Sequence, residues 1–64
     1  MRRILEIRRH ESGVSKDGTP YTRTYALVEG SDEVYGFGTD YAVGELVMVF
    51  FHDKYGAAKM RKPD

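Results

Sequence analysis

The pattern of apolar and polar positions along the chain is typical of short β-strands rather than helices. Threonine, tyrosine and valine predominate between residues 21 and 28, and side chains at alternate positions of a strand share one face. Residues 45–51 form the most apolar stretch, which is short and rich in β-branched residues, so we interpret it as a buried strand. The pattern predicts five strands, at residues 4–9 with a continuation toward 14, 21–28, 33–38, 45–51 and 57–61.

Turn-forming residues separate these segments. Asp17 and Gly18 form a strong turn dipeptide, because glycine adopts positive φ without steric cost. Pro20 suits the start of the returning strand, since it cannot donate a hydrogen bond within a central ladder. Further turns are expected at residues 30–32, 39–44 and 52–56.

Five short strands with tight turns and no convincing helix predict an all-β fold. We expect one domain over residues 1–64, a small five-stranded OB-like barrel with protruding β-hairpins, and an SH3-like barrel is the structural alternative. A chain of 64 residues buries little surface, and without cysteine it has neither a disulfide nor a thiolate metal site to stabilise it. Oligomerisation is therefore the leading source of extra stability.

The charges are unevenly distributed although the net charge is zero. Basic residues outnumber acidic ones in residues 1–23 and 54–64, whereas residues 24–53 contain acidic residues and no lysine or arginine. If the two ends of the chain lie together, one face is basic and suits a polyanion; the alternative is an evenly solvated small surface. The chain lacks a signal-peptide core and an apolar run that could span a membrane, so we expect a cytoplasmic protein with no membrane partner.

One predicted strand face combines aromatic and basic residues. Tyr21, Arg23 and Tyr25 alternate along residues 21–28, with Leu27 beyond them, and the opposite face carries small residues that suit a core. Tyrosine stacking and arginine contacts would engage the bases and phosphates of a single-stranded nucleic acid without reading its sequence. The alternative is that these side chains form cross-strand cation–π pairs that only stabilise the sheet.

Two expected hairpin tips add basic and aromatic residues. Lys16 lies beside glycines at the first tip, where an exposed loop could close over a bound strand, although hairpin lysines often serve solubility alone. Lys54 and Tyr55 precede a glycine at the second tip.

The sequence offers little for catalysis. His10 and His52 are the candidate bases at physiological pH, and both flank charged residues, which favours surface positions over a catalytic or metal site. The Gly-Phe-Gly run at 36–38 lacks the Gly-Lys-Ser/Thr ending of a P-loop, and we interpret it as a bulge or a sharp bend of the strand. We therefore expect no enzyme activity, no metal site and no cofactor.

Three segments together resemble one protein family. Residues 12–21 read Ser-Gly-Val-Ser-Lys-Asp-Gly-Thr-Pro-Tyr, residues 41–44 read Tyr-Ala-Val-Gly, and residues 54–56 read Lys-Tyr-Gly after a phenylalanine at 51. These segments resemble, in the same order, the DNA-binding hairpin, the Tyr-Ala-Pro-Gly segment and the later hairpin of the filamentous-phage single-stranded DNA-binding (gene-five, helix-destabilising) proteins.

The resemblance implies a five-stranded OB-like barrel that acts as a two-fold dimer and coats single strands cooperatively. It implies that Lys16 contacts phosphate, that Tyr21 stacks on a base and that Tyr55 is the aromatic residue of the second hairpin. Arg61 or Lys62 corresponds to a late basic residue near the nucleic-acid backbone. The chain departs from the family pattern at Glu11, where the family has arginine, and it is shorter. Basic residues at other positions could compensate, namely Arg8, Arg9 or Arg23.

The function expected from the sequence is sequence-nonspecific, cooperative binding of single-stranded DNA by a phage-encoded homodimer that protects the strand during replication. RNA is an alternative ligand, because nothing in the sequence reads the 2′-hydroxyl. The alternative function is that of an SH3-like protein-interaction module. The expected nucleic-acid contacts are Arg8, Arg9, Lys16, Tyr21, Arg23, Tyr25, Lys54, Tyr55 and Arg61.

Overall fold

The computed structural model describes residues 1–52 and 57–63, and every regular element in this part of the chain is a β-strand. The expected tip at 53–56, with Lys54 and Tyr55, lies outside the described residues. None of the described residues belongs to a helix long and apolar enough to cross a membrane. The strands are β1 (Arg2–Val14), β2 (Pro20–Val28), β3 (Glu33–Phe37), β4 (Leu46–His52) and β5 (Ala57–Arg61).

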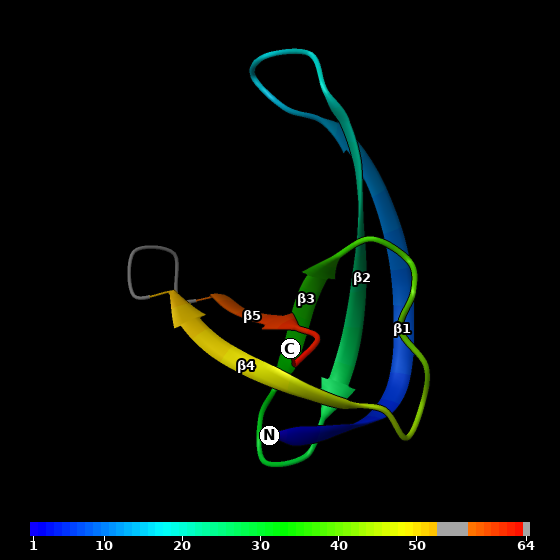
Figure 1. The fold of residues 1–64 in the computed structure, drawn as a ribbon, viewed down its shortest axis with the longest axis vertical. Coiled ribbons are helices and arrows are strands. Elements are labelled where there is room, and N and C mark those ends of the chain that lie inside the picture. The colour runs from blue at the N-terminus through cyan, green and yellow to red at the C-terminus, as the bar shows by residue number, and fades with distance from the viewer. Residues whose placement is uncertain (53–56, 64) are drawn as a thin grey trace.

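The five strands close into a barrel in the order β1-β2-β3-β5-β4 (Figure 1). The β3–β5 pair is parallel and the other pairs are antiparallel, so β5 inserts between β3 and β4. The β1–β4 seam that closes the ring is short, with only Arg2↔Val47 and Arg3↔Leu46 in register. The prediction of an all-β, five-stranded OB-like barrel is confirmed.

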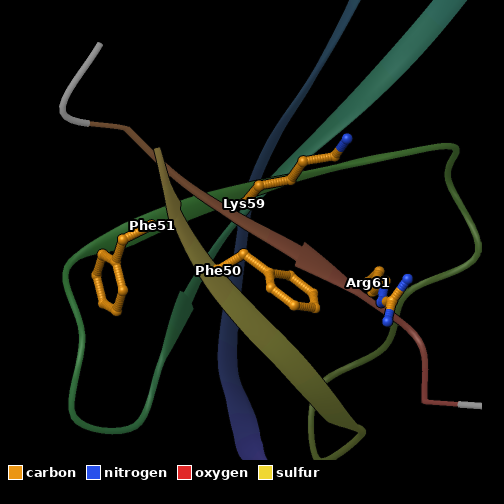
Figure 2. A pocket seen from close by; sticks show the side chains of 4 residues that line it. All are labelled: Phe50, Phe51, Lys59 and Arg61. Atoms are coloured by element: carbon orange, nitrogen blue, oxygen red, sulfur yellow. The ribbon is translucent and has the colours of Figure 1, made fainter. Parts of the chain in front are cut away.

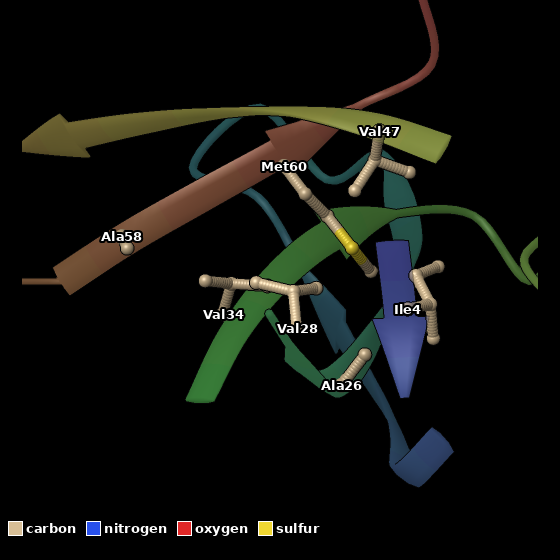
Figure 3. Close-up of a cluster of buried hydrophobic side chains, with 7 residues drawn as sticks. All are labelled: Ile4, Ala26, Val28, Val34, Val47, Ala58 and Met60. Carbon is tan, nitrogen blue, oxygen red and sulfur yellow. The ribbon is translucent and has the colours of Figure 1, made fainter. Parts of the chain in front are cut away.

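Alternate residues of the strands fill the barrel interior. Thr24, Ala26 and Val28 on β2 are buried, as the small-residue face of this strand predicted. The side chains of the hydrophobic core point toward one another between the strands (Figure 3), and they are Ile4, Ala26, Val28, Val34, Val47, Ala58 and Met60.

The buried hydroxyl of Thr24 is satisfied on two sides. It donates to the carbonyl oxygen of Gly38 at 2.6 Å, and its oxygen lies 3.0 Å from Nδ1 of His10. This pairing accounts for a polar side chain in the core, because a buried hydroxyl without a partner would be costly. His10 itself is exposed, as expected.

A bulge or a sharp bend was predicted at the Gly-Phe-Gly run; β3 contains no bulge there, but the chain bends at Gly38, directly after the strand, with a φ of 92°. The β2–β3 register continues without a shift from Arg23↔Phe37 to Leu27↔Glu33. Gly36 is needed for close packing instead, because a Cβ there would lie 2.6 Å from the Tyr41 hydroxyl and 2.9 Å from Cγ of Met60. The irregularities lie in β1, between Ile4 and Glu6 and between Ile7 and Arg9.

The β1–β2 hairpin projects well beyond the rest of the barrel (Figure 1). Its turn is held by Ser15, whose amide donates to the Thr19 carbonyl at 2.9 Å and whose hydroxyl donates to the Asp17 carboxylate. Gly18 adopts a φ of 86°, as the Asp-Gly dipeptide predicted. Lys16 is exposed at this tip.

Candidate nucleic-acid interface

The pairing register places aromatic and basic side chains in one row across the outer face of four strands. Tyr25 of β2 pairs with Tyr35 of β3, Tyr35 with Lys59 of β5, and Lys59 with Phe50 of β4. Directly paired residues point to the same side of a sheet, and the interior residues alternate with these, so the row faces outward. Arg9 of β1, opposite Tyr25, extends the row.

A second row lies beside the first. Arg23 pairs with Phe37 across β2 and β3, and Tyr21, two residues before Arg23 on the same strand, meets the edge of the Phe37 ring. Tyr21 also lies over Gly13 of β1, where an added Cβ would lie 2.5 Å from its hydroxyl. Close contact with the Gly13 backbone thereby holds Tyr21 at one edge of the outward face that these two rows form, which we call the aromatic face.

The Arg23 guanidinium lies within a ring of aromatic side chains. Its Cζ is 5.0 Å from the ring centroid of Tyr21, 5.2 Å from that of Tyr35 and 5.7 Å from that of Phe37. The side chain of Tyr25, against the opposing effect of desolvation, holds the pKa of Arg23 above its usual value, so the guanidinium is charged at any ordinary pH. Its buried Nε has no hydrogen-bond partner among the described residues.

The spacing of the aromatic rings is unlike that of stacked bases. The centroids of Tyr25 and Tyr35 are 6.0 Å apart, those of Tyr35 and Phe37 are 6.0 Å apart, and those of Phe37 and Tyr21 are 5.9 Å apart. Bases along one strand of a B-form duplex are about 3.4 Å apart. The face therefore suits a strand whose bases are drawn apart from one another.

Two cations of β5 lie over rings at the far side of the face. The Lys59 ammonium is 4.7 Å from the Phe37 centroid, and the Arg61 guanidinium carbon is 4.8 Å from the Phe50 centroid. Together with Phe51, the side chains of Phe50, Lys59 and Arg61 line a surface pocket of about 320 Å³ (Figure 2).

Ion pairs divide the basic residues into two groups. Arg3, Arg8, Arg9 and Lys62 each lie within 4.0 Å of a carboxylate oxygen, whereas Arg23, Lys59, Arg61 and Lys16 form no ion pair within the described part of the chain. Five of the six ion pairs found among the described residues join a residue of the basic ends to an acid of the middle segment, so the two kinds of charge are mixed there rather than separated into two sides. Of the described basic residues without ion pairs, four lie on the aromatic face or at the hairpin tip, whereas Arg2 of β1 donates to the carbonyl oxygen of Glu29 at 3.0 Å.

The structure brings together part of the residue set expected from the sequence. Tyr21, Arg23 and Tyr25 share the outward face, and Arg61 lies at its far side. Arg9 joins through its guanidinium, which is 4.1 Å from the Tyr25 ring centroid.

Arg8 does not join the face as a free cation. It lies at the second irregularity of β1 and pairs with Glu6 at 2.9 Å and with Glu33 at 3.7 Å. Lys16 is separated from the barrel at the hairpin tip.

Four residues of the face were not expected from the sequence: Tyr35, Phe37, Phe50 and Lys59. Alternation from the buried Val34 could have placed Tyr35 and Phe37 on the outward face. The parallel pairing of β3 with β5 that adds Lys59 has no comparable signal in the sequence.

Comparison with known proteins adds no relative: no protein-family model matches the chain, and neither a curated protein nor a solved structure matches it.

Proposed function

We propose that this protein binds single-stranded nucleic acid, DNA foremost, without catalysing a reaction and without reading sequence. The observation that supports this most directly is the outward face of β2, β3, β5 and β4, where aromatic rings alternate with cations that have no carboxylate partner among the described residues. OB barrels use the face around their second and third strands, together with the β1–β2 and β4–β5 loops, to bind oligonucleotides.

The ring spacing favours a single strand over a duplex. A duplex hides the base faces and exposes only base edges in its grooves, so it would offer these rings no stacking partner. Rings about 6 Å apart can each take one base of an extended strand, while Arg23, Lys59 and Arg61 contact its phosphates.

The proposal includes cooperative coating of single-stranded DNA by homodimers of a phage-encoded protein, as the family resemblance implies. A small core supports self-association, since a domain of this size gains much of its stability from a partner. Sedimentation velocity of the free protein should then give the mass of a dimer, and a monomer at all concentrations would remove this part of the proposal.

The test is a titration of fluorescent oligo-dT and of a matched duplex, followed by anisotropy at several salt concentrations. We expect tight binding to oligo-dT, much weaker binding to the duplex, and a logarithmic salt slope of about −2 from three cations at about 0.7 each. Equal affinity for both forms would overturn the preference for single strands, and no binding at low salt would overturn the proposal and favour a protein-interaction module.

A variant pair connects this binding to the face. Tyr21→Ala combined with Arg23→Ala should lose about 2 to 5 kcal/mol of binding free energy, because stacking and charge both act there. The matched control is Leu5→Ala with Arg3→Ala on β1, where Leu5 is exposed and Arg3 pairs with Glu29. Unchanged affinity in a folded Tyr21/Arg23 variant would place binding elsewhere on the molecule.

A further inference from the structure

The surface pocket at the far side of the face combines two features that a nucleotide requires. Its lining consists of two phenylalanines from β4, Phe50 and Phe51, and two cations from β5, Lys59 and Arg61 (Figure 2). We propose that this pocket holds one nucleotide of the bound strand, with the base against Phe50 and the phosphate on Lys59 and Arg61. The inference rests on the proposed function. It identifies where the nucleic-acid strand binds after it has passed the aromatic side chains of β2 and β3.

The aromatic side of the pocket is open to solvent. Phe50 is 37% exposed and Phe51 is 67% exposed, which is high for residues that usually lie in a core. The pocket volume of about 320 Å³ is at the small end of the range for ligand sites, so it suits one nucleotide unit. A base that covers Phe50 would remove apolar surface from water and gain a stacking contact.

The two cations of the pocket are not neutralised by a neighbouring carboxylate of the described segments. Neither Lys59 nor Arg61 forms an ion pair with another described residue, in contrast to Lys62 next in sequence, which lies 2.9 Å from Glu45 and 3.2 Å from Asp40. Arg61 lies over the Phe50 ring, and a cation–π contact leaves the guanidinium donors free for a phosphate. The pocket therefore pairs an apolar surface with positive charge, as an anionic aromatic ligand requires.

The pocket is continuous with the rings on β2 and β3. Phe50 ends the row that begins at Tyr25 and passes through Tyr35 and Lys59. Neighbouring strands lie about 4.8 Å apart, so the three steps from β2 to β4 span about 14 Å. A single strand of nucleic acid that crosses the face perpendicular to the β-strands therefore reaches the pocket directly.

A second copy of the chain fits the pocket less well than a nucleotide does. In a two-fold dimer built on this pocket, the same patch faces itself. Lys59 and Arg61 of one copy would then approach the same two cations of the other, and like charges across an interface oppose association. A polyanion with flat apolar rings has no such conflict.

The experiment combines cross-linking with affinity. Oligo-dT that carries one 5-iodouracil is irradiated with the whole protein, and the attached peptide is identified by mass spectrometry; we expect attachment at Phe50 or Phe51. Phe50→Ala should weaken oligo-dT binding about 5- to 150-fold, the equivalent of one lost stacking contact. Lys59→Gln with Arg61→Gln should reduce the salt slope by about 1.4.

The controls separate the pocket from the rest of the face. Leu46→Ala removes an exposed apolar side chain of β4 outside the pocket, and Arg3→Gln removes a cation on β1; both should bind like the unmodified protein. Circular dichroism establishes that each variant is folded, and the Lys59/Arg61 variant provides the test should Phe50→Ala unfold.

The outcomes distinguish the two proposals. If the unmodified protein binds no oligo-dT, the proposed function fails and the nucleotide assignment fails with it. If it binds oligo-dT but the pocket variants keep its affinity and salt slope and no cross-link forms on β4, only the pocket assignment is wrong. Unchanged affinity together with a loss of self-association in Phe50→Ala would also overturn the assignment and identify a contact between copies.

Discussion

At the scale of single residues, the favourable and unfavourable contributions of Arg23 to folding stability nearly cancel in the free protein. Cation–π contacts with the surrounding rings favour its position by about 0.5 to 2 kcal/mol. Its buried Nε without a hydrogen-bond partner opposes this by about 1 to 3 kcal/mol. The charge is thus of little benefit to folding, which is the situation expected of a residue placed for a ligand.

Arg23→Met tests this balance, because methionine keeps an unbranched apolar stem against Tyr21 and Tyr35 and removes the charge. We expect the free energy of unfolding in urea to change by less than about 1 kcal/mol. The salt slope of oligo-dT binding should fall by about 0.7. A large loss of stability with an unchanged salt slope would assign Arg23 to the sheet alone, the alternative that the sequence left open.

The residue pattern predicted part of this face and missed the rest for a physical reason. Tyr21, Arg23 and Tyr25 were predictable, because small residues alternate with them and identify the inward face. In β4 every residue from 46 to 51 is apolar, so no polar position distinguishes the face of Phe50 from that of Val49. Phe37 was assigned to a distortion because of its glycine neighbours, whereas it pairs regularly with Arg23 and the bend begins only at Gly38.

At the scale of elements, two glycines support the face in different ways. A Cβ at Gly36 of β3 would meet Met60 inside the core as well as the Tyr41 ring, and neither can move without disturbing the packing. The three atoms nearest to a Cβ at Gly13 of β1 all belong to the partly exposed side chain of Tyr21. The first glycine therefore supports the barrel, and the second positions an aromatic residue of the face.

Alanine at each position should separate these roles. Gly36→Ala should lower the free energy of unfolding by about 1 to 3 kcal/mol through overpacking. Gly13→Ala should change it by no more than about 0.5 kcal/mol, yet weaken oligo-dT binding by displacing Tyr21. Urea unfolding and anisotropy titration measure the two effects, and a Gly13→Ala protein with full affinity would exclude Tyr21 from the contact surface.

The segment that follows β5 is tied to the loop before β4 by charge. Hydrogen bonding to Lys62 lowers the pKa of Glu45 below its ordinary value of 4.5, and hydrogen bonding to Glu45, then to Asp40, raises the pKa of Lys62 above 10.5. A lowered carboxyl pKa gives stability that is present above pH 4.5 and lost as the pH falls through the folded-state value. A raised lysine pKa gives stability that is present below pH 10.5 and lost as the pH rises through its own.

The contribution of this ion pair should therefore be constant between about pH 5 and 10 and decline at both ends. The measurement is the urea midpoint of the unmodified protein minus that of Lys62→Met, taken across this range. Because Lys62 is exposed and Glu45 is only partly buried, the difference should also shrink as salt is added. A difference that stays constant down to acid pH would assign the effect of Lys62 to its contact with Tyr41, whose ring centroid lies 5.5 Å from its ammonium.

At the scale of the whole molecule, the strand positions were predictable but their arrangement was not fully determined by local signals. Strand ends follow from turn residues and from alternation, which act within a few positions. Barrel closure depends on the short pairing of Arg3 with Leu46, and the face depends on the parallel pairing of Tyr35 with Lys59. Both contacts join residues far apart in the sequence, so only the assembled fold reveals which cations reach the aromatic rows.

A barrel with so small a core should gain much of its apparent stability from its ligand. Oligo-dT at 100 times its dissociation constant contributes about 2.7 kcal/mol. For a domain of this size that corresponds to an increase in Tm of about 10 to 20 °C, measured by differential scanning calorimetry. Because the binding is partly electrostatic, the increase should become smaller as salt is added at a fixed oligonucleotide concentration.

Two comparisons decide whether this increase comes from the aromatic and basic face. Poly-glutamate of matched charge has carboxylates but no bases, so it should raise Tm much less than oligo-dT does if the rings contribute. The Tyr21/Arg23 double variant should show a smaller increase with oligo-dT, since it lacks one stacking contact and one cation. Equal increases with poly-glutamate and oligo-dT would mean that charge alone drives binding, and the rings of Tyr25, Tyr35 and Phe50 would then serve the sheet rather than a nucleic acid.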